Sequence, residues 1–477
     1  MGAEVRLDGQ TLTVAALVAI ASGHAEVTVD PAALALVDRR HALLLAARAH
    51  GAVYGANTGV GANRNERSDA VDHGLRLLRS HCAAVGPVED DQTARAAMAT
   101  RLNQILAGGS GISRRVAQAL AEALYAGAVP TLHSWGAIGT GDLAALAELG
   151  LTLAGERPWR SGRGPVTTID ATDALPMISS SAVTVATAAL ALHRVQEQLR
   201  ASTVVGALTF LALRGNPEAY DEQVHAARGH PCQAAVATAL RAMVGGCPAP
   251  ARIQDPFGLR VVPQVTAPAL HAARELDEVL AAELNAAAEN PLVTAGGVRH
   301  HGQFHTATMA THLDAVRGSF LPVLSLSAAR LGLLMRPDLT GLRAFLAAGP
   351  SGSSGLMISE YVVQDLLTEI RVGMQPVAAG TLSISLGLEE HASFATQGAR
   401  SLRTMTQLAP ALLAAELVAA VRALRMAPGR LADGPARKAF DLAAAALDAD
   451  EEDRPLGEDL ARAAALLPAL SALPDLG

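Results

Sequence analysis

Two glycine-rich loops in the first third of the chain carry side chains that could do acid–base or covalent chemistry. Tyr54 stands in the Gly/Asn-rich stretch 51–67, and Thr140 stands in the stretch 135–143. A phenol can give or take a proton, but its pKa near ~10 requires a cationic or hydrogen-bonding neighbour before it acts as a base at neutral pH. By spacing alone, the tyrosine is a packed aromatic and the second loop is a helix–helix connection.

The loop 135–143 predicts a tight turn that leads into a helix. It holds three glycines, which allow unusual backbone angles, and Asp142 stands where a carboxylate suits a helix N-terminus. A phosphate-binding loop is excluded, because no strand precedes the glycines and no Gly-Lys-Ser/Thr follows them.

The elements that must position these loops are mainly α-helical. Half of the 477 residues are hydrophobic and only 3% are aromatic, so closely packed Ala/Leu helices are expected. Two short strand-like pieces, 4–7 and 26–28, come first. The helical pattern then covers 31–49, 68–84, 92–107, 113–126, 142–154, 179–213, 217–229, 231–244, 265–289, 305–335, 355–373, 381–424 and 433–448. We expect an N-terminal domain (1–178), a central long-helix bundle (179–430) and a C-terminal helical cap (431–477).

Composition excludes several classes of function. The net charge is −7 without a basic stripe, which argues against nucleic acid as a partner. Lys438 is the only lysine, so a Schiff-base mechanism has a single, poorly placed candidate. Three scattered cysteines, no basic segment leading into a long apolar run and no uninterrupted apolar stretch of about 18 residues predict a cytoplasmic protein without a membrane span.

Several short segments, taken in order, resemble the motifs of the histidine and aromatic amino acid ammonia-lyase family. Together they extend over most of the chain, so the resemblance implies an ammonia-lyase/fumarase-like fold and a homotetramer whose active sites draw loops from several subunits. The matching segments are Tyr54–Gly61, Arg79–Gly86, Gln254–Arg260 with Pro263-Gln264, Glu289–Leu292, Gly302–His305 and Glu389–His391.

The place of the family's prosthetic group departs from the family pattern. That group, methylidene-imidazolone (MIO), forms from an internal Ala-Ser-Gly, whereas this chain has Gly139-Thr140-Gly141, one residue short and without the serine. Ser179 stands where an asparagine supports the MIO oxygen, and Phe257 has lost a tyrosine hydroxyl. These differences predict no cofactor; the alternative is an MIO-like group made from Thr140.

The resemblance also assigns roles to single residues. Tyr54 would be the general acid or base, and His81 would face the substrate ring. Arg260 would bind the amino acid carboxylate through two parallel hydrogen bonds from its planar guanidinium group, and Gln254 would orient the same end of the substrate. Glu389 would hydrogen-bond an imidazole or bind an ammonium group. Phe304 is either core or pocket wall.

A metal site is a weaker interpretation. Histidines gather at 300, 301 and 305, but no paired carboxylate or HExxH motif supports them.

Three functions remain open from the sequence. The first is an MIO-independent lyase that performs α,β-elimination, or the reverse addition, on a histidine-like or aromatic amino acid derivative, including a betaine that releases an amine. The second is a histidine or aromatic amino acid ammonia-lyase or aminomutase with an MIO-like group from Thr140. The third is a non-catalytic homologue, which the presence of Tyr54, Arg260 and Glu389 argues against.

Overall fold

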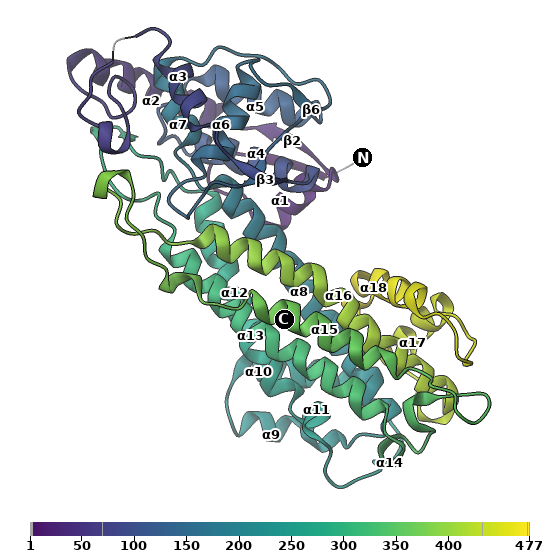
Figure 1. Ribbon diagram of the computed structural model, residues 1–477. Coiled ribbons are helices and arrows are strands. Elements are labelled where there is room, and N and C mark those ends of the chain that lie inside the picture. The colour runs from purple at the N-terminus through teal and green to yellow at the C-terminus, as the bar shows by residue number, and fades with distance from the viewer. Residues whose placement is uncertain (1–2, 69, 432, 475, 477) are drawn as a thin grey trace. The chain divides into compact units, whose positions relative to one another are not determined.

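A computed structural model describes residues 3–68, 70–431, 433–474 and 476 (Figure 1). The chain divides into two compact units, and each draws on three stretches of sequence. Unit 1 comprises Met1–His193, Leu276–Asp314 and Pro376–Arg403, and unit 2 comprises Arg194–Glu275, Ala315–Gln375 and Thr404–Gly477. The division into three domains made from sequence stays a prediction.

Unit 1 combines helices of ordinary length with short strands. All four sheets among the described residues have two strands: β1 pairs in parallel with β2, whereas β3 with β5, β4 with β6 and β7 with β8 are antiparallel. Its elements are β1 (Ala3–Leu7), α1 (Val14–Ala21), β2 (Ala25–Val29), α2 (Pro31–His50), η1 (Gly61–Asn63), α3 (His73–His81), β3 (Val85–Val88), α4 (Asp91–Leu106), α5 (Arg114–Tyr125), β4 (Val129–Pro130), β5 (His133–Trp135), α6 (Leu143–Leu153), β6 (Trp159–Ser161), α7 (Ala171–Ile178), β7 (Leu292–Thr294), β8 (Gly297–Arg299), η4 (Val377–Ala379) and η5 (Ser385–Gly387).

Helix α4 is the buried centre of unit 1. The side chain of Asp90 caps it by accepting a 2.7 Å hydrogen bond from the Thr93 N–H, and every residue from 96 to 106 is buried. Small alanines let neighbouring elements approach closely. The same burial forces its polar residues Arg101 and Gln104 to find partners inside the protein.

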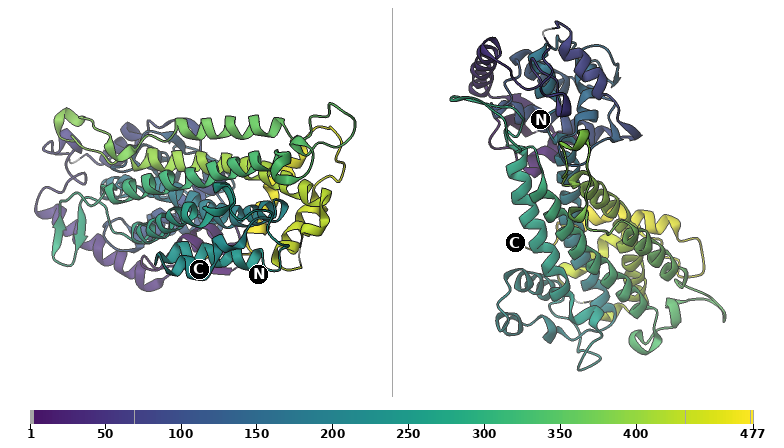
Figure 2. Two further views of the ribbon diagram at one scale, coloured as in Figure 1. Left: turned by 90° about the horizontal axis from the view of Figure 1, so that it is seen from below. Right: turned by 60° about the vertical axis from the view of Figure 1, so that its left-hand side comes forward.

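Unit 2 is a bundle of long helices, which run side by side in all views (Figures 1 and 2). The long helices α8 (Ala182–Ala212), α12 (Val262–Leu284), α13 (Ala307–Leu334) and α16 (Ala395–Met426) contribute residues to both units. The other elements are η2 (Pro217–Tyr220), α9 (Glu222–Ala226), α10 (Pro231–Met243), α11 (Phe257–Arg260), α14 (Pro337–Thr340), η3 (Ala344–Leu346), α15 (Ile358–Val372), η6 (Pro428–Arg430), α17 (Pro435–Ala446) and α18 (Gly457–Ser471).

A buried ion pair ties three of these helices together. The carboxylate of Glu416 on α16 accepts hydrogen bonds from Arg330 (2.6 and 2.8 Å) and Ser327 (2.5 Å) on α13 and from Thr209 (2.6 Å) on α8. Removing one partner would leave a buried charge uncompensated, at a cost of about 3–5 kcal/mol.

The helix expected over 381–424 begins fourteen residues later, at Ala395. The preceding segment is irregular because Ser385, Leu386 and Phe394 take positive φ angles of 55°, 56° and 56°, and a β-bridge joins Ile384 to Glu389. Glu389 therefore lies on a loop and not inside a long helix.

Two helical stretches are long and apolar enough to cross a membrane by length and composition, 171–212 and 395–426. In the most apolar window of each, 94% and 78% of the residues are buried inside the protein, as in the core helices of a folded protein.

Candidate active site

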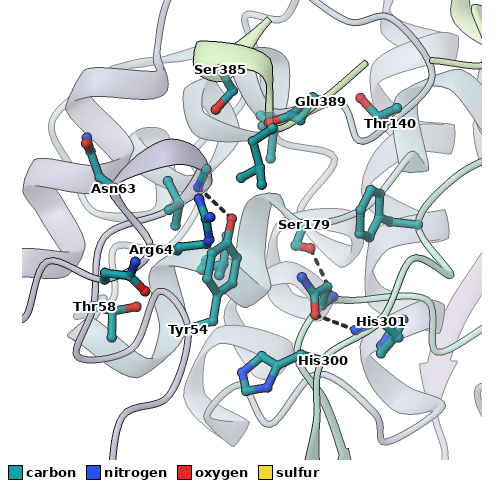
Figure 3. A pocket seen from close by; sticks show the side chains of 18 of the residues that line it. Tyr54, Thr58, Asn63, Arg64, Thr140, Ser179, His300, His301, Ser385 and Glu389 are labelled. Carbon is teal, nitrogen blue, oxygen red and sulfur yellow. Dashed lines mark hydrogen bonds between the residues drawn. The ribbon is translucent and has the colours of Figure 1, made fainter. Parts of the chain in front are cut away.

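Unit 1 contains a pocket of about 770 Å³ (Figure 3). Its wall is built from loops and helix ends that are far apart in the sequence. The lining residues include Tyr54, Thr58, Asn63, Arg64, His81, Thr140, Ser179, Asn290, His300, His301, Phe304, Ser385 and Glu389. Six of the predicted site residues thus meet in one cavity: Tyr54, His81, Thr140, Ser179, Phe304 and Glu389.

The loop that carries Tyr54 is held by an asparagine side chain. Asn57 accepts a 2.7 Å hydrogen bond from the Val53 N–H and donates one of 2.9 Å to the Gly51 carbonyl, which folds the segment into a turn. At the far side of this turn the Gly61 N–H donates a 2.7 Å hydrogen bond to the phenol oxygen of Tyr54 (Figure 3).

The charge state of Tyr54 follows from its surroundings. Burial raises the pKa of the phenol above its ordinary value and outweighs the other influences. The Gly61 amide and the Arg64 guanidinium lower this pKa, and Glu389 raises it. The hydrogen-bonding and cationic neighbours expected from the sequence are present, yet the phenol keeps its proton at neutral pH.

Glu389 reaches the same pocket from the irregular segment before α16. A Cβ atom built on Gly61 would lie 3.8 Å from Glu389 Oε1 and 2.7 Å from Ser385 Oγ. Ser385 also accepts a 3.0 Å hydrogen bond from the Ala62 N–H. The tyrosine loop and the Glu389 loop are therefore in contact.

His81 ends α3 and lines the pocket. Its Nδ1 lies 2.9 Å from the carbonyl oxygen of Leu77, which can only accept, so in the neutral ring Nδ1 carries the proton. The Nε2 atom is then a hydrogen-bond acceptor.

Gln254, Phe257 and Arg260 do not line this pocket, because they belong to unit 2. The Arg260 guanidinium carbon lies 4.6 Å from the ring centre of Phe257, which is 65% exposed. The Nε of Arg260 is buried without a partner. The predicted carboxylate-binding group thus belongs to unit 2, whereas the residues that line the pocket of Tyr54 belong to unit 1.

Sequence reasoning missed His301 as a pocket residue, having weighed it only as a metal ligand. Its Nδ1 accepts a 2.9 Å hydrogen bond from the Gln303 N–H, so Nε2 carries the proton in the neutral ring, and this N–H is buried without a partner. His300 lies beside Tyr54, with ring centres 6.4 Å apart and rings nearly perpendicular. No signal in the sequence separates these two histidines from surface histidines, and the described residues contain no group of three metal-binding side chains.

Comparison with known proteins defines the class. A family model described as "Aromatic amino acid lyase" matches residues 12–445. The histidine ammonia-lyase of Geobacillus kaustophilus (strain HTA426) is 33% identical over 445 residues, which cover 87% of each chain.

Two solved structures extend the comparison. Tyrosine aminomutase from Streptomyces globisporus superimposes with a TM-score of 0.91 at 26% identity, over 98% of this chain and 97% of the other. Ergothionase from Treponema denticola superimposes with a TM-score of 0.89 at 23% identity, over 98% and 99% of the two chains, and this likeness supports the fold.

The chain belongs to the aromatic amino acid lyase family. It is an enzyme of the carbon–nitrogen lyase class, most similar in sequence among these proteins to a histidine ammonia-lyase. The predicted family, the mainly α fold and the prediction of an enzyme are confirmed.

The prediction that no cofactor is involved is wrong at the level of the family. The chain's relatives and neighbours are named histidine ammonia-lyase and tyrosine aminomutase, and the family uses MIO formed from its own chain.

The residues present here do not fit the MIO ring as the family builds it. Gly139 has φ +84°, and a Cβ added to it would lie 2.0 Å from Ser393 Oγ, so the alanine of Ala-Ser-Gly has no room. The Gly139 carbonyl instead accepts hydrogen bonds from the hydroxyls of Thr306 (2.9 Å) and Ser393 (2.8 Å). Thr140 lines the pocket in place of the serine.

Proposed function

We propose that the protein removes the amino group of a histidine-like α-amino acid by α,β-elimination, or adds it in the reverse direction. The observation that carries this proposal is the 2.7 Å bond from the Gly61 N–H to Tyr54, which fixes a phenol oxygen in the pocket wall. The family membership supports the same reaction class.

Tyr54 would take the proton from the β-carbon. In the elimination, the Cβ–H electrons form the new double bond, the Cα–N bond breaks towards nitrogen, and the amine leaves with its electron pair. The Gly61 N–H stabilises the phenolate, because hydrogen bonding to a charged form favours it. A cationic substrate nitrogen next to Glu389 would cancel the charge that raises the pKa of the phenol.

His81 would recognise the substrate ring. Its Nε2 is an acceptor in the neutral tautomer and suits a ring N–H such as that of an imidazole. A phenyl ring offers no donor to this atom, so a histidine-like ring is favoured over phenylalanine. Phe304 would form part of the apolar wall of the same pocket.

We propose that a partner chain binds the substrate carboxylate. We infer a homotetramer in which Arg260 of a neighbouring copy, with Gln254 and Phe257 beside it, closes the pocket that holds Tyr54. The unpartnered Nε of Arg260 and the exposed Phe257 ring fit a surface that another copy covers.

We also propose a cytoplasmic location, since all three cysteines are free thiols.

The leaving amine would be ammonia or, from a betaine, a tertiary amine. A substrate screen tests the proposal by following the absorbance of the unsaturated acid while ammonia and trimethylamine are measured separately. Equimolar acid and amine from a histidine derivative would support it. Release of neither product from histidine, tyrosine, phenylalanine or their betaines would refute it.

A further inference from the structure

Three segments that supply residues to the active-site pocket are joined to one another in unit 1. They are 138–140, which carries Thr140, 304–306, which carries Phe304, and 389–394, which carries Glu389. We call the contacts between them the polar junction. Because the three segments are far apart in the sequence, these contacts decide how their pocket residues lie relative to one another.

The buried part of the polar junction is built on two neighbouring carbonyl groups. The Gly139 carbonyl accepts hydrogen bonds from the hydroxyls of Thr306 at 2.9 Å and Ser393 at 2.8 Å. The Ile138 carbonyl accepts a 2.8 Å hydrogen bond from the Phe394 N–H. Carbonyl groups, hydroxyls and backbone amides do not titrate near neutral pH, so this part of the junction does not respond to pH there.

The outer part of the polar junction is an exposed contact between two histidine rings. Nε2 of His305 lies 3.0 Å from Nδ1 of His391, and the ring centres are 5.0 Å apart. His305 directly follows Phe304 in the chain, and His391 comes two residues after Glu389. Because a histidine ring changes its charge near pH ~6.5, this contact is the titratable part of the junction.

The segment that carries Glu389 depends on such contacts. Three residues other than glycine between 385 and 394 take positive φ angles, which are strained and persist only when the surroundings hold them. Before Glu389, the Ser385 hydroxyl accepts a 3.0 Å hydrogen bond from the Ala62 N–H. After it, the histidine pair ties the same segment to the one that carries the phenylalanine of the pocket wall. Glu389 is thus held between two contacts with other parts of unit 1.

We propose that His305 and His391 are positioning residues that hold Glu389 and Phe304 in the active-site pocket. This inference deepens the proposed function and rests on it, because Glu389 is the group that would face the substrate nitrogen. Neither histidine is among the residues that line the pocket, so both act through the segments that carry them. No bond of the substrate forms or breaks at this pair.

The pair forms a hydrogen bond only while at least one ring is neutral. A neutral ring offers one donor and one acceptor nitrogen, whereas a protonated ring offers only donors. Two protonated rings therefore cannot share a hydrogen bond, and their charges repel. Burial and the charge of His391 lower the pKa of His305, so His305 stays neutral at pH values where a free histidine is already charged.

The direction of the pH effect follows from this lowered pKa. Neutral His305 stabilises the junction fully above the ordinary histidine pKa of about 6.5, and this contribution is lost as the pH falls through the lower value in the folded protein. The titratable group that faces His305 is His391, and the carboxylates of Glu389 and Glu390 precede His391 in the same segment. We therefore expect Glu389 to leave its position in acid and to keep it in base.

Crystal structures of the full-length protein test the positioning directly. At about pH 8, above the ordinary histidine pKa, the wild type should show His305 bonded to His391 and Glu389 in the pocket. In His391→Ala at the same pH, and in the wild type at about pH 5, the segment 384–391 should shift and Glu389 should leave the pocket, while the Gly139 carbonyl keeps its two hydroxyl partners. Glu389 unmoved in both structures would overturn the inference.

Two substitutions at one position separate positioning from folding. His391→Ala removes the ring and should lower kcat/KM by about tenfold to 10²-fold, which is the order of cost of a misplaced active-site group. His391→Asn places a neutral amide where Nδ1 stood, so it should restore most of this loss at about pH 8. Wild-type kcat/KM in a folded His391→Ala protein would contradict the role of the pair.

The acid side of the pH profile gives a readout that a merely structural role would not move. Below about pH 6 the wild type should lose kcat/KM more steeply than the tenfold per pH unit expected from a phenol base alone. His391→Asn should lack this additional loss, because an amide does not titrate. The control is His312→Asn on α13, whose ring nitrogen lies 2.8 Å from the Thr308 carbonyl of the same helix, and it should keep the wild-type profile. Identical profiles of His391→Asn and the wild type would overturn the inference.

The crystal structures need no turnover, so the two proposals can fail separately. A protein in which Glu389 moves when the pair is lost, but which eliminates nothing, would refute the proposed function alone. A protein that eliminates an amine, with Glu389 and kcat/KM unaffected by His391→Ala, would refute only the role of the pair.

Discussion

The backbone N–H of Gly61 donates a 2.7 Å hydrogen bond to the phenol oxygen of Tyr54, seven residues earlier in the chain. The bond occupies one lone pair of the oxygen and leaves the phenolic proton free to point into the pocket. A single backbone contact therefore orients the group that we propose as the base. It also favours the deprotonated form, against the effect of burial.

Replacing Tyr54 by phenylalanine tests this base. Tyr54→Phe should retain the fold, because the ring stays, and should reduce turnover about 10²–10⁴-fold, the usual effect of one positioned proton-transfer group. The matched control is Tyr125→Phe, which removes the hydroxyl of a tyrosine that is 80% exposed. Near-normal turnover in Tyr54→Phe, with an unchanged circular dichroism spectrum, would show that Tyr54 contributes packing and not proton transfer.

The pH dependence of turnover gives an independent check. Burial raises the pKa of Tyr54, so the phenolate fraction grows throughout the neutral and mildly alkaline range. Turnover should rise by about tenfold per pH unit below that pKa. The residual activity of Tyr54→Phe should lack this rise, and a flat profile in the wild type would argue against a phenol base.

Mixing two inactive variants tests whether the site is shared between copies. Arg260 lies in unit 2 and does not line the pocket of Tyr54. Co-expression of Tyr54→Phe with Arg260→Ala should restore about a quarter of the wild-type activity, since one site in four then combines two intact groups. A chain carrying both substitutions gives the baseline. Failure to exceed this baseline would mean that both groups act within one chain, whereas full activity of Arg260→Ala alone would show that Arg260 has no role.

The chemistry of Arg260 can be separated from its position. Arg260→Lys keeps the positive charge but replaces the planar, bidentate guanidinium by an ammonium group. Because this weakens substrate binding, the substitution should raise KM more than it lowers kcat. Steady-state kinetics of the purified variant measure both constants. Unchanged values would remove Arg260 from the site.

The carboxyl group of Asp142 makes stability depend on pH. It is buried, and burial raises its pKa to about 6, although it accepts hydrogen bonds from the N–H and the hydroxyl of Thr184 at 2.7 Å each. A folded-state pKa above the unfolded one means that protonated Asp142 stabilises the fold. Its contribution to the free energy of unfolding is complete below pH ~4 and is lost as the pH rises through 6.

Asp142→Asn should therefore gain stability relative to the wild type on going from pH 4 to pH 7. The change in relative free energy of unfolding should be about 2–3 kcal/mol, from the difference between the two pKa values. Denaturation curves at both pH values measure it. Parallel curves for the two proteins would contradict a raised pKa.

Adding one methyl group to Gly139 tests how tightly the loop before Thr140 is packed. Gly139→Ala should destabilise the protein by about 1–3 kcal/mol, because its Cβ would meet Ser393 at 2.0 Å and φ is +84°. The control is Gly318→Ala on α13, where a Cβ meets nothing within 4 Å; it should leave stability unchanged or slightly raised. Equal melting temperatures of the two variants would show that the loop accommodates the added methyl group without loss of stability.

The sequence predicted the helical architecture and six pocket residues, because motif spacing and helical periodicity are local signals. Helical periodicity continues through 385–394 in the sequence, so Glu389 is predicted inside a helix. In the fold, Gly387 and three other residues of this segment take positive φ angles, which interrupt the helix. His301 could not be found, because its tautomer and its unfilled N–H depend on contacts with Gln303 and the pocket. That Tyr54 belongs to unit 1 and Arg260 to unit 2 is likewise a property of the folded chain.

The most direct test of the central claim is product analysis with the purified enzyme. Incubation with L-histidine and with its trimethylammonium betaine should give, for at least one of them, an unsaturated acid and an equimolar amount of free amine, and Tyr54→Phe should lose both products together. A β-amino acid formed without free amine would instead indicate an aminomutase. Formation of neither product from these or the aromatic amino acids, by a correctly folded protein, would contradict the proposed elimination.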